Sequence, residues 1–370
     1  MADRHRRRID QVGIYFGKLA RMFLYQNDWK VIPMAMLIAA VVSIVVKKDF
    51  FVNMEGTLKG ALALSCIGIW NGCFNSIQVI CRERDVVKRE HRSGMHISSY
   101  IISHMLYQMI LCLLQTIATV VVLVAIGIKF PSQGVMSNRM LVDIAVTVFL
   151  ITYAADMMAL FISALVRSTT TAMTVMPFLL IVQLIFSGGI FVLPEWSDTI
   201  AKFTISHYGV RCISAEAGFN DLPSTTAWNT LEKMKDADIP VSITTGELAK
   251  MFQNEDVKPI QKLRDRDLRL PNDSSVKVGE IGDSLIANYN LTEDTDVITF
   301  SFTIKDMIDL VGEEAVERYI KEKTSATMRR DYYEQTPENI TRYWISLAVF
   351  ALVCAVLATV ALEFIDKDKR

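Results

Sequence analysis

Residues 81–95, CRERDVVKREHRSGM, are the stretch from which the organisation of the whole chain can be worked out. From Arg82 to Arg92, eight of eleven residues are charged, and both signs are present. A long apolar run stands on each side of this cluster. Asp85 precedes Arg89 by four residues, the spacing and order in which an acid and a base stabilise a helix. We therefore predict a short charged helix between two membrane spans.

The composition predicts a membrane protein. Of the 370 residues, 51% are hydrophobic, and the mean hydropathy is +0.30, which is too apolar for an ordinary soluble domain. A helix needs about 20 apolar residues to cross a bilayer core. Six spans are predicted, at 31–47, 58–81, 99–128, 139–166, 171–192 and 342–363. The first thirty residues hold seven Lys and Arg and no long apolar run, so no cleavable signal peptide is expected.

The net charge of −1 conceals two oppositely charged parts. Residues 213–340 hold 25 acidic and 15 basic residues, whereas the rest of the chain holds 15 acidic and 24 basic ones. The acidic block has no apolar run of spanning length. We therefore predict that it is a separate water-exposed domain, mostly α-helical, with a possible strand at 296–302.

The orientation follows from the Lys and Arg of the short loops. Residues 1–30 hold seven, residues 82–92 hold five, Arg167 adds one and the tail after residue 363 adds three. The loops on the other side hold few: Lys47, Lys48, Lys59, Lys129 and Arg139. Both termini and the charged helix are therefore expected in the cytoplasm, and the acidic block outside it.

Two further features belong to this all-α, six-span fold class. A helix within residues 1–30 is predicted to be amphipathic. Its apolar face holds Val12, Tyr15, Phe16, Leu19, Met22 and Phe23, and its polar face holds Asp10, Gln11, Gly17, Lys18 and Arg21. In the fifth span, Pro177 and the pair Gly188–Gly189 are predicted to break the helix, and residues 192–212 to form a re-entrant segment.

The charged stretch and its flank, ERDVVKREHRSGMHISSYIISHML, resemble the loop after the second span of G-subfamily ABC exporters, the white and pleiotropic-drug-resistance type (type V exporters). The matching residues are Glu83, Arg84, Val87, Arg89, Glu90, Ser93, Gly94, Met95 and Tyr100. FSGGIFVLPEW, followed by FTISHYGVR, resembles the broken fifth span of that family. The sequence departs from the pattern at His96 and His207. The resemblance covers about 1–212 and 342–370, and none is found for 213–340.

The resemblance implies roles for the cytoplasmic elements. The segment 82–94 would be a coupling helix that touches the ATPase domain, with Glu83, Arg84, Val87, Arg89 and Glu90 as the coupling residues. The alternative is a merely solvated loop. The N-terminal amphipathic helix would be the connecting helix that packs on the coupling helix, or else a generic interfacial anchor.

The resemblance also implies partners. No phosphate-binding G-x-x-x-x-G-K-[ST] motif occurs, so ATP and Mg²⁺ are expected on an ABC ATPase, in a partner chain or in another part of a longer polypeptide. The chain itself is expected to be no enzyme and to hold no cofactor or metal, because its cysteines form no C-x-x-C pair. The other expected partners are a second permease copy, as homodimer or heterodimer, and membrane lipid, but no nucleic acid. The expected location is a bacterial cytoplasmic membrane.

Polar residues within the spans are the remaining candidates, because they are costly in lipid. Asp156, Gln108 and His104 are predicted to join spans 3 and 4 by hydrogen bonds, with a proton or substrate role as the alternative. By resemblance, spans 2 and 5 line a central cavity and the region after span 5 forms an outer gate. The cavity residues would be Asn71, Phe74, Asn75, Thr174, Met176 and Phe178, and the gate residues Ile190 and Phe191. Plain helix packing is the alternative for each.

Three functions are compatible with six spans. The first is the permease of an ATP-driven exporter that moves an amphipathic or lipid-like cargo, a drug or a peptide. The second is a non-transport sensor or assembly protein of the same fold, whose outer domain binds a ligand or partner. The third is a channel, which would show a repeated polar stripe that the spans lack. The charged helix favours the exporter.

Overall fold

The computed structural model describes residues 8–25, 28–189, 195–235, 238–244, 264–269, 275–289, 297–303, 305, 308 and 312–364. The chain divides into two units. The bundle unit comprises Met1–Pro223 and Met328–Arg370, and the second unit comprises Ser224–Thr327. We describe each unit by itself.

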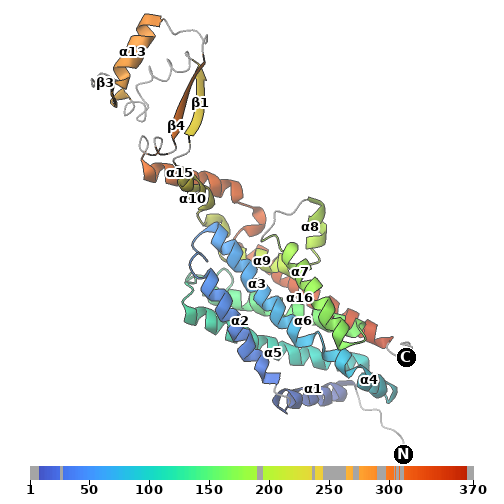
Figure 1. Cartoon of the computed structure of the whole chain (residues 1–370). Helices are drawn as coiled ribbons and strands as arrows, with labels where there is room; N and C mark the ends of the chain where they lie inside the picture. Colours follow the sequence, from blue (N-terminus) through green and yellow to red (C-terminus); the bar gives the residue numbers. More distant parts are fainter. Residues whose placement is uncertain are drawn as a thin grey trace, which may run out of the picture. The chain divides into compact units, whose positions relative to one another are not determined.

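The bundle unit is built of helices (Figure 1). They are α1 Arg8–Tyr25, α2 Val31–Val46, α3 Met54–Ser76, α4 Val79–Arg92, α5 Ile97–Ile126, α6 Met140–Leu165, α7 Thr169–Ile185, α8 Glu195–Ala201, α9 Ile205–Glu216 and α16 Pro337–Glu363, with the short 3-10 turns η1 Asp28–Lys30, η2 Phe219–Asp221 and η3 Asp331–Tyr333. Both predicted cytoplasmic helices are present as α1 and α4. They lie at one end of the bundle, together with the last turn of α16 (Figure 1).

Four helical segments in the described part of the chain are long and apolar enough to cross a membrane. They are 54–92, which joins α3 to α4, and the helices α5, α6 and α16. Helices α2 and α7 are apolar too, but they have 16 and 17 residues, and so are shorter than the predicted spans 31–47 and 171–192. The chain is therefore a membrane protein, and a count of six spans depends on α2 and α7.

Local sequence signals set several helix boundaries. The Asn53 side chain accepts a hydrogen bond from Gly56 N at 2.6 Å and starts α3, and Ser168 starts α7 in the same way. The left-handed glycines Gly94 (φ 101°) and Gly127 (φ 87°) follow the ends of α4 and α5, where residues other than glycine are strained. The short connections thus follow from caps and glycines that the sequence already contains.

Helix α6 is the centre of the bundle, with α3, α5, α9 and α16 packed around it. The two glycines of a G-x-x-x-G pair on α3 let the backbones of α3 and α6 approach closely. A Cβ atom at Gly72 would lie 2.2 Å from the Thr152 carbonyl oxygen, and one at Gly68 would lie 2.9 Å from the Ile151 side chain. Along this seam Ile151 and Ala155 are fully buried.

The fifth span differs from the prediction. Pro177 lies inside the continuous helix α7 and does not break it. The helix ends at Ile185, shortly before Gly188, whose φ of 73° turns the chain. Of the predicted re-entrant segment 192–212, residues up to 194 lie outside the described residues. The remainder forms α8 and most of α9, whose residues are almost all buried.

In its described residues, the second unit holds more helix than strand, in line with the expectation of a mostly α-helical domain. It holds α10 Thr226–Lys233, α13 Val278–Tyr289 and α15 Glu313–Met328, whose last residue belongs to the bundle unit. Strand β1 Asp238–Thr244 pairs antiparallel with β4 Val297–Thr303, and β2 Asp267–Arg269 pairs with β3 Ser275–Lys277. Strand β4 matches the predicted strand at 296–302. The unit is also shorter at both ends than the predicted domain 213–340.

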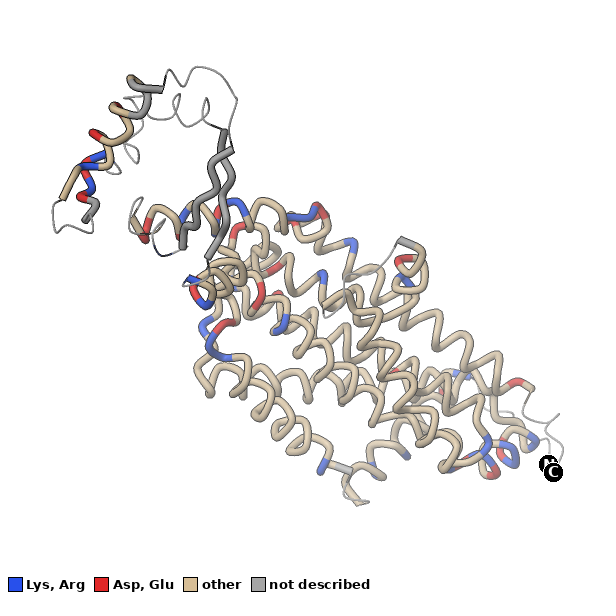
Figure 2. Tube along the Cα trace, turned by 45° about the horizontal axis from the view of Figure 1, so that its top comes forward, with Lys and Arg blue, Asp and Glu red and all other residues tan. Residues whose placement is uncertain are grey.

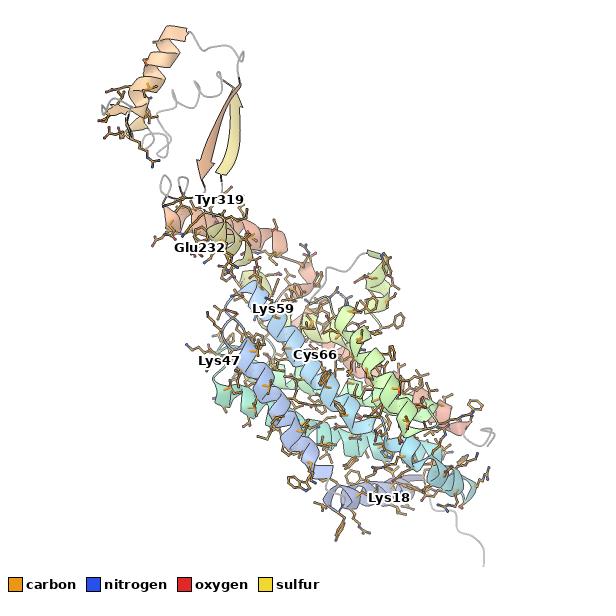
Figure 3. All side chains as sticks on the ribbon, viewed as in Figure 1. Lys18, Lys47, Lys59, Cys66, Glu232 and Tyr319 are labelled. Carbon is orange, nitrogen blue, oxygen red and sulfur yellow. The ribbon has the colours of Figure 1, made fainter. Side chains whose placement is uncertain are left out.

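Charge is distributed unevenly along the bundle (Figure 2). The middle of the helices carries few Lys, Arg, Asp or Glu residues, whereas charges gather on α1 and α4 (Figure 2). Lys18 on α1 marks this end, and Lys47 and Lys59 mark the opposite end (Figure 3). The charge-poor middle is the part that a bilayer core accommodates.

Candidate functional site

Helix α4 has one buried face and one exposed face. Ile80, Cys81 and Val87 are buried against the bundle. Asp85, Arg89 and Arg92 are exposed, and their spacing of four and three residues places them on one stripe of the helix. We call this stripe the outward face of α4. Among the described residues, the apolar contacts of α4 with the bundle therefore run along the side opposite this face.

Helix α1 holds α4 by polar contacts. Lys18 Nζ lies 3.2 Å from Glu83 Oε2, and the Tyr15 hydroxyl donates a hydrogen bond to Glu90 Oε2 at 3.0 Å. The Gln11 side chain binds the turn after α4, since its Nε2 donates to Gly94 O at 3.3 Å and its Oε1 accepts from His96 N at 2.9 Å. Of the predicted apolar face of α1, Leu19 is buried and the Tyr15 ring packs against Tyr100. Gln11 and Lys18, predicted on the opposite face, turn out to make these contacts.

Helix α6 holds α4 from the other side. Arg84 Nη1 donates to the carbonyl oxygens of Ala164 at 2.8 Å and Val166 at 3.1 Å. These carbonyls end α6, where partners within the helix are lacking and the helix dipole is negative, so an arginine fits well. Ser163 Oγ in turn accepts from the backbone N–H groups of Ile80 and Cys81, at 3.0 and 3.1 Å. Each helix thus satisfies backbone groups at the end of the other.

These contacts show which of the five predicted coupling residues bind the bundle and which are exposed. Glu83, Arg84 and Glu90 bind α1 or α6, and Val87 is buried at 1% exposure. Arg89 is the member of the set that is exposed. The motif therefore fixes α4 to the bundle, and the outward face consists of other residues in addition to Arg89. We call the contacts of α1, α4 and α6 the α4 junction.

The predicted intramembrane polar groups lie in a buried cluster that joins α3, α5 and α6. Cys112 Sγ donates to Asp156 Oδ2 at 3.2 Å, which is the predicted bond from the acid to the third span. Gln108 Nε2 donates to Ser76 Oγ at 2.9 Å. His104 is 1% exposed and lies one helical turn from Gln108. The cluster joins three helices where the surrounding side chains are apolar.

One reciprocal amide pair extends this cluster. Asn75 Nδ2 donates to Gln115 Oε1 at 2.8 Å, and Gln115 Nε2 donates back to Asn75 Oδ1 at 3.1 Å. Gln115 is fully buried. Asn75 thus contacts α5, although it was predicted to face a central cavity.

The other predicted cavity residues divide between surface and interior. On α3, Asn71 is buried and Phe74 is 51% exposed. On α7, Met176 is buried, whereas Thr174 and Phe178 are exposed. The predicted gate residues, Ile190 and Phe191, lie outside the described residues.

A second buried acid was not predicted from the sequence. Glu216, the last residue of α9, is 1% exposed. Thr147 Oγ1 donates to its Oε1, and Trp344 Nε1 donates to Thr147 Oγ1 at 2.7 Å. Burial raises the pKa of Glu216 to about 8, and the nearby Asp143 carboxylate raises it further, against the lowering effect of the Thr147 hydrogen bond. No local pattern marks this residue, whereas the G-x-x-x-G pair of α3 was visible in the sequence.

Comparison with known proteins assigns the family. The chain is 29% identical to an ABC transporter ATP-binding/permease protein of Mycobacterium tuberculosis over 126 residues. That alignment covers 33% of this chain and 14% of the relative, so the chain spans a small part of that protein's length. Residues 18–215, more than half of the chain, match the ABC-2 type transporter family. The chain therefore belongs to the ABC-2 type transporter family and is a membrane component of an ABC transporter.

Proposed function

We propose that the chain is the permease subunit of an ATP-driven exporter of the G-subfamily type, which moves an amphipathic, lipid-like cargo outward. ATP and Mg²⁺ are bound by a separate ABC ATPase domain, and a second permease copy completes the transport path. The observation that carries the proposal is the α4 junction. A charged helix is bound to two other helices on one side, and Asp85 and Arg89 are exposed on the other.

The junction is suited to transmitting a displacement. Because Arg84 and Ser163 tie the ends of α4 and α6 to one another, a push on α4 must move the end of α6 as well. Tyr15 and Lys18 extend the same connection to α1. Helix α6 is packed against most of the bundle, so its displacement reaches the transport path.

The outward face is suited to docking a protein. It presents Asp85, Arg89 and Arg92 on a rigid helix, and mixed charge favours one partner surface and register over others. The partner is the ABC ATPase, in line with the family. Since α1, α4 and the last turn of α16 share one end of the bundle (Figure 1), this end is the cytoplasmic one in the proposal.

The exposed side chains of α3 and α7 are suited to an amphipathic cargo. Trp70 and Phe74 on α3 are 44% and 51% exposed, and Phe178 on α7 is 68% exposed. Thr174 adds a hydroxyl on the same helix. Aromatic groups with a few polar neighbours bind amphiphiles, and a second copy facing these helices would enclose them.

The proposal is tested by reconstitution. The chain is purified together with the ABC ATPase that accompanies it and is placed in proteoliposomes. ATP hydrolysis and the outward movement of a fluorescent phospholipid analogue are then measured. Arg84→Ala should keep the ATPase bound but slow the movement by at least about tenfold, because charge-assisted bonds worth about 1.5–3 kcal/mol are lost at the α4 junction. The double variant D85R/R89E should instead release the ATPase.

Arg139→Ala is the matched control, since Arg139 is exposed next to the start of α6, at the other end of that helix. It should leave both readouts unchanged. Failure of any ABC ATPase to co-purify would contradict the exporter. Hydrolysis without movement of the lipid analogue in the unmodified complex would favour the sensor alternative. Wild-type movement by Arg84→Ala would exclude transmission through α6.

A further inference from the structure

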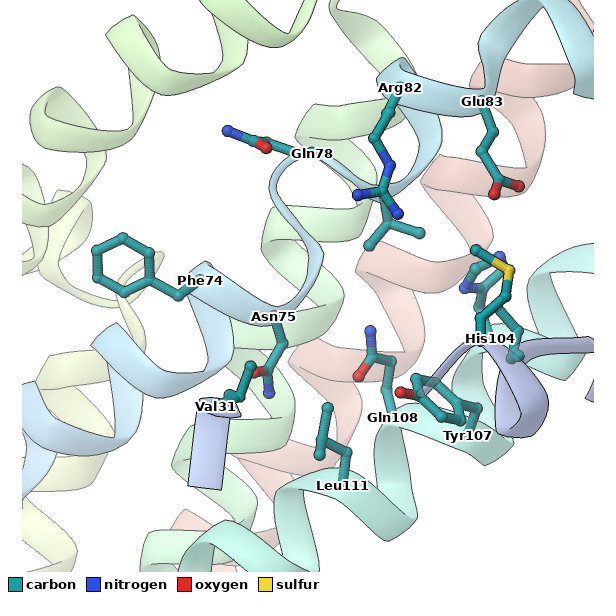
Figure 4. Close-up of a pocket in the computed structure, with 13 residues that line it drawn as sticks. Val31, Phe74, Asn75, Gln78, Arg82, Glu83, His104, Tyr107, Gln108 and Leu111 are labelled. Atoms are coloured by element: carbon teal, nitrogen blue, oxygen red, sulfur yellow. The ribbon is translucent and has the colours of Figure 1, made fainter. Parts of the chain in front are cut away.

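Two adjoining cavities open beside the α4 junction, and Phe74, one of the exposed residues of α3, lies at their border. The first has a volume of 170 Å³ and lies among α1, α3, α4 and α5 (Figure 4). The second has 410 Å³, within the usual range of ligand pockets, and lies among α2, α3 and α5. Val31 and Phe74 line both cavities. The two therefore form one cleft, which we call the α2–α5 cleft.

Each of the two cavities is lined by one basic side chain. Arg82 on α4 points toward the first cavity (Figure 4), and Lys30 lines the second. Glu83 is the acidic residue among the described lining residues, and Lys18 neutralises it at 3.2 Å. In the described part of the chain, no ion pair involves Arg82 or Lys30. Two positive charges thus remain for an anion.

The remainder of the cleft is apolar. Met34, Ala35 and Ile38 of α2 line the second cavity, and Met34 is 56% exposed, which leaves the cleft open at its side. Asn71 and Gln115 provide amides deeper along it. Basic side chains beside an apolar slot complement a molecule with an anionic head and a hydrocarbon chain.

Two residues that line the first cavity have buried side-chain atoms without a hydrogen-bond partner. Among the described residues, the two ring nitrogens of His104 have no hydrogen-bond partner, and Gln108 Oε1 has none either. Both residues are 1% exposed. Both residues line the cavity, and Figure 4 shows Gln108 facing Asn75 across it. Unsatisfied buried polar groups are costly, so this place is suited to a ligand with its own donors and acceptors. The hydroxyl and ester groups of a glycerophospholipid provide both.

We infer that the α2–α5 cleft binds one anionic glycerophospholipid. The phosphate lies between Arg82 and Lys30, the glycerol groups lie near His104 and Gln108, and an acyl chain follows α2. Arginine and lysine at the membrane surface are the usual ligands of such headgroups. With α4 at the cytoplasmic end, the lipid comes from the inner leaflet. This site adjoins the proposed transport path, with which it shares Phe74.

The test is lipid binding by native mass spectrometry of the full chain, which requires neither ATPase nor transport and so can fail independently of the exporter proposal. The purified chain is titrated with phosphatidylglycerol and, in parallel, with phosphatidylcholine of the same acyl chains. One phosphatidylglycerol should be retained in preference. The double variant K30Q/R82Q should weaken its binding by about tenfold, as expected for the loss of two basic contacts with an anionic lipid.

The matched control is K47Q/K48Q, which removes the same charge at the other end of α2, where both lysines are exposed. It should bind like the unmodified chain. Val31→Trp keeps the charges but obstructs the slot, and it should also lose the lipid. Equal losses in K30Q/R82Q and K47Q/K48Q would overturn the inference.

Inorganic phosphate separates a lipid site from a simple anion site. It should not displace phosphatidylglycerol, because the acyl chain contributes much of the binding. Displacement by phosphate, or undiminished binding to V31W, would show an anion site without a chain slot and would overturn the assignment of a lipid. Each variant is first compared with the unmodified chain by thermal unfolding in phosphatidylcholine. If V31W unfolds early, Ala35→Phe, which fills the same cavity, replaces it.

Discussion

Helix α6 is held by two unlike interfaces. Along its middle, the G-x-x-x-G face of α3 meets it by shape, with Gly72 against the Thr152 backbone. At its end, α4 meets it by charge and hydrogen bonds, through Arg84 and Ser163. The first interface tolerates no extra atom, whereas the second consists of contacts that water and salt can replace. A transporter needs both kinds of interface. The close packing of α3 and α6 keeps the bundle rigid, and the polar contacts of α4 with α6 can break and form again when the bundle is displaced.

Adding one methyl group where α3 meets α6 should have the largest effect on stability. In Gly72→Ala, the new Cβ would lie 2.2 Å from the Thr152 oxygen, so the two backbones must separate. We expect the unfolding free energy to fall by more than about 3 kcal/mol, which is at the upper end of the destabilisation caused by overpacking a core. Gly17→Ala is the control, since no atom lies within 4 Å of the new Cβ in α1. Thermal unfolding in detergent micelles compares them, and equal midpoints would disprove the close seam.

The buried Glu216 should give the next largest effect, and it depends on pH. Its pKa is raised from 4.5 to about 8 in the folded chain, so the folded state holds the proton more tightly than the unfolded one. Stability therefore falls as pH rises from about 4.5 to 8, by a few kcal/mol at most. Glu216→Gln imitates the protonated acid. It should match the unmodified chain at pH 5 and exceed it at pH 9.

Glu334→Gln is the control for this pH effect, because Glu334 is exposed in the same unit. Its unfolding midpoint should follow that of the unmodified chain at every pH. A Glu216→Gln midpoint with the same pH dependence as the unmodified chain would mean that the acid is ionised in the fold.

The amide pair of α3 and α5 should show a moderate coupling. Asn75→Ala and Gln115→Ala each remove the two hydrogen bonds between the amides. A double-mutant cycle should give a coupling of about 0.6–2 kcal/mol, the range of such bonds between membrane helices. Unfolding in sodium dodecyl sulfate measures it. If the losses of unfolding free energy in the two single variants simply add up in the double variant, the two amides do not interact.

The ion pair of the α4 junction should have the smallest effect on stability. Lys18 and Glu83 are partly exposed, at 36% and 18%, so their attraction is screened. Lys18→Met should cost less than about 1 kcal/mol at low salt, and the difference should shrink at 1 M salt. Unfolding at both salt concentrations measures it. A larger loss of unfolding free energy that is the same at both salt concentrations would show that packing holds the α4 junction, as it holds the contact of α3 with α6.

Local patterns predicted the elements well where neighbours along the chain decide the structure. The spacing of Asp85 and Arg89 predicted α4, and the periodicity of α1 predicted a helix in which Leu19 is buried. Pro177 does not break α7, because a membrane helix can absorb a proline when neighbouring groups satisfy the freed carbonyl. Strands β1, β2 and β3 were not predicted. Strand β1 pairs with β4, which is distant in the sequence, and β2 and β3 have three residues each, too few to show an alternating pattern.

The sequence by itself determined that the chain crosses a membrane, where its helices lie and that one of them carries dense mixed charge. Apolar runs and helical periodicity are properties of neighbouring residues, so they can be read without knowing the fold. The tertiary structure alone decided which side of α4 is bound. Tyr15 and Glu90 are 75 positions apart, and Arg84 and Ala164 are 80 apart. Such pairs meet because of how the helices pack, as does the burial of Glu216.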